Sequence, residues 1–113
     1  MSQSKLIRFR HGASVPLAEL PRLDFPEFRQ SLLQEVAADA RVASFFGQPT
    51  VDGLDLFAIL GHDWKGEMAL LHTCVGNSYP ALTPDCPQLH LFERELAEQY
   101  GVRPEGHPWL KPV

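Results

Sequence analysis

Two segments of the chain repeat apolar side chains with the spacing of an α-helix. In each segment the apolar positions follow offsets of 3, 7 and 11 residues, which places them on one face of a helix. The first stripe is Phe25, Phe28, Leu32 and Val36, and the second is Leu89, Phe92, Leu96 and Tyr100. The spacing therefore predicts two amphipathic helices, over residues 25–40 and 88–100.

The residues at the ends of these segments agree with helix boundaries. Asp24 stands before the first stripe and Glu27 follows three residues later, which is the spacing of a capping box. Pro26 falls in the first turn, where its missing N–H costs nothing. Gly101 follows the second stripe at the position where a left-handed residue ends a helix.

Three apolar segments between the two helices have the composition of β-strands. They cover residues 41–46, 54–60 and 68–75. Asp52-Gly53 is a strong signal for a chain reversal before the second segment, and residues 61–66 suit a hairpin connection before the third. The sequence therefore predicts a short, mostly antiparallel sheet.

Nine of the ten prolines lie before residue 27 or after residue 79. The parts of these flanks outside the two predicted helices lack a regular pattern. Residues 5–9 suit a short strand or a loose arm, and residues 79–87 suit an extended loop stiffened by proline. We expect one α+β domain of two layers, with the sheet packed against the two helices. Its expected parts are an arm over residues 1–23, a core over 24–101 and an extended tail over 102–113.

Composition and charge narrow the classes of function. The 113 residues suit a single domain, and no apolar run approaches the ~20 residues of a membrane-spanning helix. The start of the chain lacks the apolar segment of an ordinary secretory signal. The chain has ten Lys and Arg and fourteen Asp and Glu, so its net charge is -4. This net negative charge disfavours nucleic acid as a partner, because binding to phosphates requires positive charge.

Metal and nucleotide cofactors lack their usual motifs. The residue types that bind zinc are present as Cys74, Cys86, His62, His72, His90 and His107. Structural zinc usually shows pairs of ligands two to four residues apart, and no Cys-x-x-Cys or His-x-x-x-His pair occurs. No glycine-rich phosphate loop occurs either. We expect reduced, buried thiols and no metal or cofactor, although the spacing of the two cysteines permits a disulfide.

A small enzyme is the alternative function that the residues allow. Cys74 and His72 are two residues apart on a predicted strand, so their side chains share one face. A cysteine nucleophile requires an imidazole within reach and a group that orients it. A small residue packed in the core of the sheet is the simpler interpretation of Cys74.

The most informative segment is the carboxy-terminal one, residues 92–113. Glu93, Arg94 and Glu95 are consecutive in the second predicted helix, so they cannot all point in the same direction. The tail then carries Trp109 and Leu110 among prolines. Apolar groups on a stiff, extended segment are better suited to contact a partner than to stay in water.

These residues resemble the signature of a known family. The pattern is Glu-Arg-Glu at residues 93–95, an acidic residue at 98, an aromatic at 100, Gly101, and Gly106-His107-Pro108. It is similar to the 30-kDa subunit of respiratory complex I, the NADH-quinone oxidoreductase. The ending Gly-His-Pro-Trp-Leu-Lys-Pro-Val looks still closer to the corresponding domain of membrane-bound nickel–iron hydrogenases of the formate-hydrogenlyase type. Glu98 and Gln99, where respiratory members usually have Asp and an apolar residue, favour the hydrogenase-like branch.

The resemblance implies a non-catalytic part of an oxidoreductase complex that docks to the hydrogenase-like large subunit of the 49-kDa type. The residues that it marks as partner-binding or structural are Glu93, Arg94, Glu95, Gly101, Gly106, His107 and Pro108, with Trp109 from the ending. The resemblance implies that the protein lies in the cytoplasm, or peripherally on the cytoplasmic face of the membrane. In the second case only the complex holds it at the membrane. The chain is then either a separate small subunit or a portion whose catalytic continuation is absent.

Overall fold

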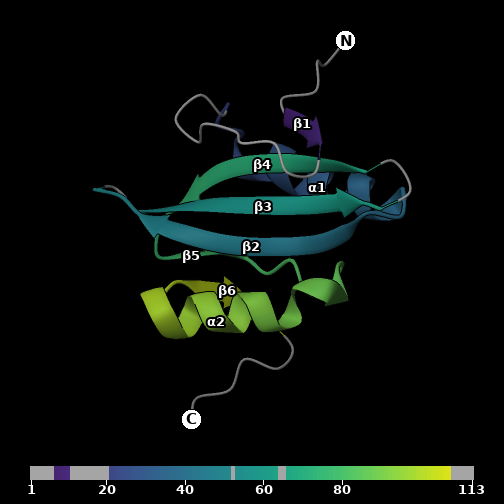
Figure 1. Ribbon diagram of the computed structural model, residues 1–113. Coiled ribbons are helices and arrows are strands. Elements are labelled where there is room, and N and C mark those ends of the chain that lie inside the picture. Colours follow the sequence, from purple (N-terminus) through teal and green to yellow (C-terminus); the bar gives the residue numbers. More distant parts are fainter. Residues whose placement is uncertain (1–6, 11–20, 52, 64–65, 108–113) are drawn as a thin grey trace.

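The computed structural model describes residues 7–10, 21–51, 53–63 and 66–107. Its main element is a four-stranded antiparallel sheet with the strand order β1-β4-β3-β2 (Figure 1). The strands are β1 (Ile7–Arg10), β2 (Arg41–Pro49), β3 (Leu54–His62) and β4 (Glu67–Val75). The three predicted strands are confirmed and each is longer than expected, while β1 confirms the strand alternative for the amino-terminal arm.

The first helix, α1 (Phe25–Ala37), begins where the capping residues predict. The Asp24 carboxylate accepts a hydrogen bond from the backbone N–H of Glu27 over 2.9 Å, and Pro26 lies in the first turn. The helix ends before the predicted residue 40, because Ala38 caps it and Asp39 turns the chain with a φ of 71°. This turn directs the chain into β2.

The core lies between α1 and one face of the sheet. Phe28 and Leu32, the centre of the predicted stripe, are completely buried. They pack with the inward side chains Leu56, Ala58 and Leu60 of β3 and Ala69 and Leu71 of β4. The alternate residues of β3 and β4 point to the other face, where Phe57 and Leu70 form a second apolar cluster. Alternation along the strands therefore gives two buried faces, as the almost continuous apolar sequence of β3 requires.

The second helix lies along the edge strand β2 (Figure 1). A 3₁₀ turn, η2 (Pro87–Leu89), leads into α2 (His90–Tyr100), and Leu89 and Leu96 are buried as the second stripe predicts. Two hydrogen bonds fix the helix segment to the strand. The Val42 N–H donates to Gln88 Oε1 over 2.7 Å, and the Tyr100 hydroxyl donates to the Gly47 carbonyl over 3.1 Å. The predicted α+β class, with a mostly antiparallel main sheet and two helices, is confirmed.

A second, two-stranded sheet differs from the expectation of irregular flanks. β5 (Ser78–Pro80) pairs in parallel with β6 (Arg103–Glu105), so part of the predicted loop and part of the predicted tail are β-structure. The pair is extended by the bonds from Ala81 N to the Glu105 carbonyl and from Arg103 N to the Asn77 carbonyl. Residues 103–105 thus belong to the folded domain, while residues 108–113 lie outside the described part of the chain.

Candidate docking surface

The three consecutive residues Glu93, Arg94 and Glu95 are divided by α2 among different environments. Each helical residue is rotated by about 100° from the one before it. Glu93 is completely buried, Arg94 is half-buried and Glu95 is exposed. The three residues therefore have separate roles, and only Arg94 and Glu95 are accessible to another molecule.

Glu93 holds the loop that precedes η2. Its carboxylate accepts hydrogen bonds from the backbone N–H groups of Leu82, over 3.0 and 3.2 Å, and of Thr83, over 2.8 Å. The Thr83 hydroxyl also donates to the same carboxylate. A buried carboxylate requires such donors, because burial without them costs several kcal/mol. Glu93 is thus a structural residue of the site, which fixes the loop between β5 and α2.

The residues after α2 set the path of the chain beyond the helix. Gly101 has a φ of 70° and its N–H donates to the Ala97 carbonyl over 3.0 Å, as the predicted helix end requires. Gly106 also has a positive φ, 84°, where a side chain is strained. His107 is buried, its Nε2 lies 3.2 Å from the His90 carbonyl oxygen, and its ring faces the His90 ring at 5.5 Å. Pro108 and Trp109 lie outside the described residues.

The exposed face of α2 carries an accessible leucine between charged residues. Leu91 is 69 % exposed, and apart from Val51 it is the only large apolar residue so exposed in the described part of the chain. Arg94 and Glu95 follow at offsets of 3 and 4, so the three side chains are neighbours on the helix surface. We call Leu91, Arg94 and Glu95 the docking face. Sequence reasoning missed Leu91, although a leucine outside the apolar stripe of an amphipathic helix is a signal for a contact.

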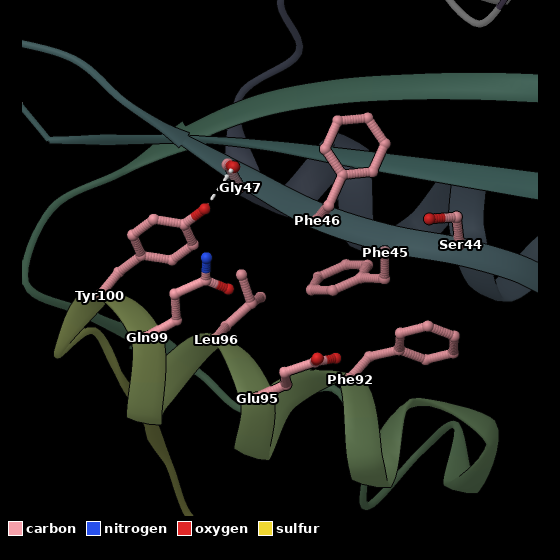
Figure 2. A pocket seen from close by; sticks show the side chains of 9 residues that line it. All are labelled: Ser44, Phe45, Phe46, Gly47, Phe92, Glu95, Leu96, Gln99 and Tyr100. Carbon is pink, nitrogen blue, oxygen red and sulfur yellow. Dashed lines mark hydrogen bonds between the residues drawn. The ribbon is translucent and has the colours of Figure 1, made fainter.

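A groove between β2 and α2 continues the docking face toward the sheet (Figure 2). Its volume is ≈ 190 Å³. The lining side chains from α2 are Phe92, Glu95, Leu96, Gln99 and Tyr100, and β2 contributes Ser44, Phe45, Phe46 and Gly47. Small-molecule sites usually occupy about 300–1,000 Å³. The groove is therefore small for a cofactor or substrate, and it has the size of a single side chain.

A wider groove of ≈ 700 Å³ lies along α1. It is lined by Phe25, Pro26, Arg29, Gln30, Leu33, Gln34, Ala37 and Pro80. Its one charged residue, Arg29, is already paired with Asp85. This groove therefore offers no unsatisfied charge to a ligand, whereas Glu95 in the groove beside α2 has no hydrogen-bond or ion-pair partner among the described residues.

The two residues of the alternative enzyme hypothesis share one face of β4, as predicted. His72 Nε2 lies 3.4 Å from Asp55 Oδ1, and the His72 ring stacks on Phe57 at 4.5 Å. Burial raises the pKa of the Cys74 thiol, and the hydrogen bond and charge of Asp55 raise it further. A cysteine nucleophile requires a lowered pKa, because the thiolate is the reactive form. This environment opposes the chemistry that the hypothesis needs.

Slow alkylation is the expected consequence for Cys74. We expect iodoacetamide to modify Cys74 at pH 7 several-fold more slowly than it modifies glutathione, because the raised pKa and partial burial reduce the accessible thiolate. Peptide mass spectrometry over a time course measures the rate and separates Cys74 from Cys86. A rate above that of glutathione would contradict the assignment and revive the enzyme hypothesis.

The ionisable groups in the described part of the chain do not assemble into a metal site. In residues 7–10, 21–51, 53–63 and 66–107, no three His, Cys, Asp or Glu side chains come together in a way that could bind a metal ion. Cys74 and Cys86 are both free thiols, so the disulfide that their spacing permits is not formed. Within the same residues, none of the helices has the length and apolar character needed to cross a membrane.

A family comparison decides the origin of the carboxy-terminal pattern. The family described as respiratory-chain NADH dehydrogenase, 30 Kd subunit, matches residues 28–113, which include most of α1, all of α2 and every residue of the docking face. The chain belongs to this family. It is therefore a member of the 30-kDa subunits of NADH dehydrogenase-type complexes, and the resemblance inferred from residues 93–108 is confirmed at this level. No curated protein compared with the chain gives a significant match.

Proposed function

We propose that this 30-kDa-type subunit is a non-catalytic docking part of a membrane-associated oxidoreductase complex and binds the hydrogenase-like large subunit of the 49-kDa type. The docking face of α2 is the contact, and the expected docking tail continues it through Pro108 and Trp109, beyond the part of the tail that β6 fixes in the fold. Electron transfer takes place on the partner subunits, and attachment to the cytoplasmic face of the membrane is indirect, through the complex. The ending of the chain favours the formate-hydrogenlyase-type branch over the respiratory one.

The observation that carries this proposal is the separation of roles along α2. Leu91 is exposed beside Arg94 and Glu95, while Glu93 and the glycines fix the helix and the chain that follows it. Interface contacts commonly combine an apolar anchor with arginine, because the guanidinium makes bidentate contacts with carboxylates. Arg94 has no ion-pair partner among the described residues, so its charge is free for such a contact.

Capture of the purified large subunit from the same organism tests the proposal. We expect Arg94→Ala to weaken binding about 10-fold or more, as loss of an interfacial arginine commonly does. Arg22→Ala is the matched control, because Arg22 is exposed and lies before α1, away from the docking face. Binding is measured by biolayer interferometry with the full chain immobilised, and thermal unfolding establishes that both variants are folded.

Two results would count against the proposal. Equal binding of wild-type, Arg94→Ala and Arg22→Ala chains removes α2 as the contact. Absence of binding by the wild-type chain to the large subunit removes the partner assignment. Parallel measurements with a hydrogenase-type and a respiratory-type large subunit decide between the two branches, and we expect the tighter complex with the hydrogenase type.

A further inference from the structure

The groove between β2 and α2 combines an unpaired carboxylate with aromatic walls. Phe92 and Tyr100 of α2 and Phe45 of β2 line it, and the side chain of Glu95, which is exposed, extends along α2 toward Phe92 (Figure 2). Glu95 also belongs to the docking face, so a molecule bound there reaches the groove directly. The docking surface thus combines a groove with the negative charge of Glu95.

We propose that this groove receives an arginine side chain of the partner subunit, whose guanidinium pairs with Glu95 while its aliphatic stem lies against the aromatic walls. The inference rests on the proposed docking function and specifies its chemistry. The partner subunit is the protein that covers the docking face of α2, and it contributes the arginine to the contact.

A cationic occupant follows from the charge on the groove. Covering Glu95 with a neutral, apolar side chain would remove water from a carboxylate that has no partner among the described residues. Such an uncompensated charge is costly to bury, whereas a cation offsets the cost with a charge-assisted hydrogen bond. The aromatic rings favour the same occupant, because a cation over an aromatic face is attracted by the ring quadrupole.

Arginine fits the lining better than lysine. Besides the Glu95 carboxylate, the groove offers the side-chain amide oxygen of Gln99 as an acceptor (Figure 2). A guanidinium has five N–H donors in a plane and stacks on aromatic rings, whereas an ammonium is a compact charge that is strongly hydrated. These two acceptor groups beside aromatic rings therefore match the arginine geometry.

The backbone at the groove excludes the main alternative, an added β-strand. β2 is an edge strand, and edge strands can bind an extended peptide through their free backbone groups. Here α2 lies along that edge, and two of the edge groups are already bonded, Val42 N–H to Gln88 and the Gly47 carbonyl to Tyr100. An entire strand cannot pair between these two points, but a single side chain can enter the ≈ 190 Å³ groove.

Binding of the large subunit to charge-neutralised variants is the decisive test. Glu95→Gln keeps the size of the side chain and removes the charge, and Glu98→Gln removes a charge from an exposed position of α2 that does not line the groove. We expect Glu95→Gln to weaken binding at least ~10-fold and to flatten its salt dependence, and Glu98→Gln to weaken it less than ~3-fold. Equal losses of affinity in the two variants would show that only the overall charge of the helix matters, and would overturn the proposal.

A small-molecule titration tests the groove without the partner. N-acetyl-arginine-N′-methylamide is added to the isotopically labelled full chain, with the citrulline analogue as a neutral control of the same shape. We expect saturable NMR shifts at Phe92, Glu95 and Gln99 in the millimolar range with arginine, and none of this size with citrulline or with the Glu95→Gln chain. The corresponding lysine derivative is titrated as a second control. Equal shifts with citrulline, equal shifts with the lysine derivative, or shifts away from the groove would refute the proposal.

The two experiments separate this inference from the proposed function. If the wild-type chain binds the large subunit and Glu95→Gln binds equally well, the docking function stands and the arginine contact is wrong. If the wild-type chain does not bind but the arginine analogue shifts the groove residues, the partner assignment fails and the groove remains a guanidinium site. If the wild-type chain does not bind the large subunit and the arginine analogue does not shift the groove residues, both the docking function and the arginine contact are wrong.

Discussion

Replacement of Glu93 by alanine is expected to lower the free energy of unfolding by about 3–5 kcal/mol. The substitution deletes a completely buried carboxylate and leaves the N–H groups of Leu82 and Thr83 and the Thr83 hydroxyl without their acceptor. Each buried donor without a partner costs about 1–3 kcal/mol. Total stabilities are commonly about 5–15 kcal/mol, so this loss is a large fraction of the whole.

Urea unfolding followed by circular dichroism measures this loss. Glu98→Ala is the matched control, since it truncates an exposed glutamate of the same helix, and we expect a change within about 0.5 kcal/mol. Glu93→Gln should fall between the two, because the amide keeps one acceptor oxygen for the loop. An unfolding free energy of Glu93→Ala within error of wild type would show that the carboxylate does not hold the loop.

The same position separates a structural glutamate from a docking one. If Glu93 acts only through the fold, Glu93→Gln should bind the large subunit with almost the wild-type affinity at temperatures where it remains folded. Arg94→Ala, in contrast, should lose affinity without losing stability, because Arg94 is half-buried and has no bonded partner among the described residues. Substitutions at these two neighbouring residues thus have different effects: replacement of Glu93 lowers stability, and replacement of Arg94 lowers affinity.

The helices and strands were predictable from the sequence because local pattern determines them. The stripe through Phe28 and Leu32 depends only on the helical period, and both side chains are completely buried. Gly101 ends α2 in the left-handed conformation for an equally local reason. The apolar run of β3 likewise required no knowledge of the partner strands.

The small parallel sheet could not be predicted, because nothing local indicates it. β5 contains Pro80 and β6 contains Pro104, and proline in a short segment argues against a strand. The two strands are also far apart in sequence, with the whole of α2 between them. Their ladder uses the N–H groups of Ala81 and Arg103, so the prolines need not donate. Pairing of this kind depends on tertiary packing.

The candidate site was only partly accessible to sequence reasoning. Helical geometry indicates that Glu93, Arg94 and Glu95 diverge, and the position of Glu93 between Leu89 and Leu96 on the buried side could have marked it as a core carboxylate. Its hydrogen-bond donors come from a loop 10 and 11 residues earlier, which no periodicity reveals. The groove beside Glu95 also depends on how α2 packs against β2, and is therefore a tertiary feature.

A second buried glutamate, outside the docking surface, links three elements of the main domain. Glu35 of α1 is held by two hydrogen bonds from Arg8 of β1, over 2.8 and 3.2 Å, and lies 3.0 Å from His62 Nε2 of β3. Burial alone raises the pKa of Glu35, but the hydrogen bonds from Arg8 and His62 outweigh it, so the pKa in the folded chain is below its ordinary value. The ionised form is therefore the one that the fold stabilises.

Glu35→Gln is expected to lower the free energy of unfolding by about 2 kcal/mol at pH 7, because it weakens charge-assisted hydrogen bonds to a buried group. The sign of the pH dependence follows from the lowered pKa. Stabilisation by Glu35 is fully present above the unfolded-state pKa of about 4.3, and it is lost as pH falls through the lower folded-state value. The difference between wild type and Glu35→Gln should therefore be constant near neutrality and shrink in acid.

Urea unfolding of both chains from pH 7 down to pH 3 measures this difference. Asp63→Asn is the control, since Asp63 pairs with Arg41 at the surface and a pair of this kind contributes at most about 1 kcal/mol. A gap between wild type and Glu35→Gln that widens in acid would contradict the lowered pKa. A gap that is absent at pH 7 would show that Arg8 does not fasten β1 to the domain through Glu35. The expected pattern instead makes this buried carboxylate the ionic connection between the amino-terminal strand and the helix that covers the sheet.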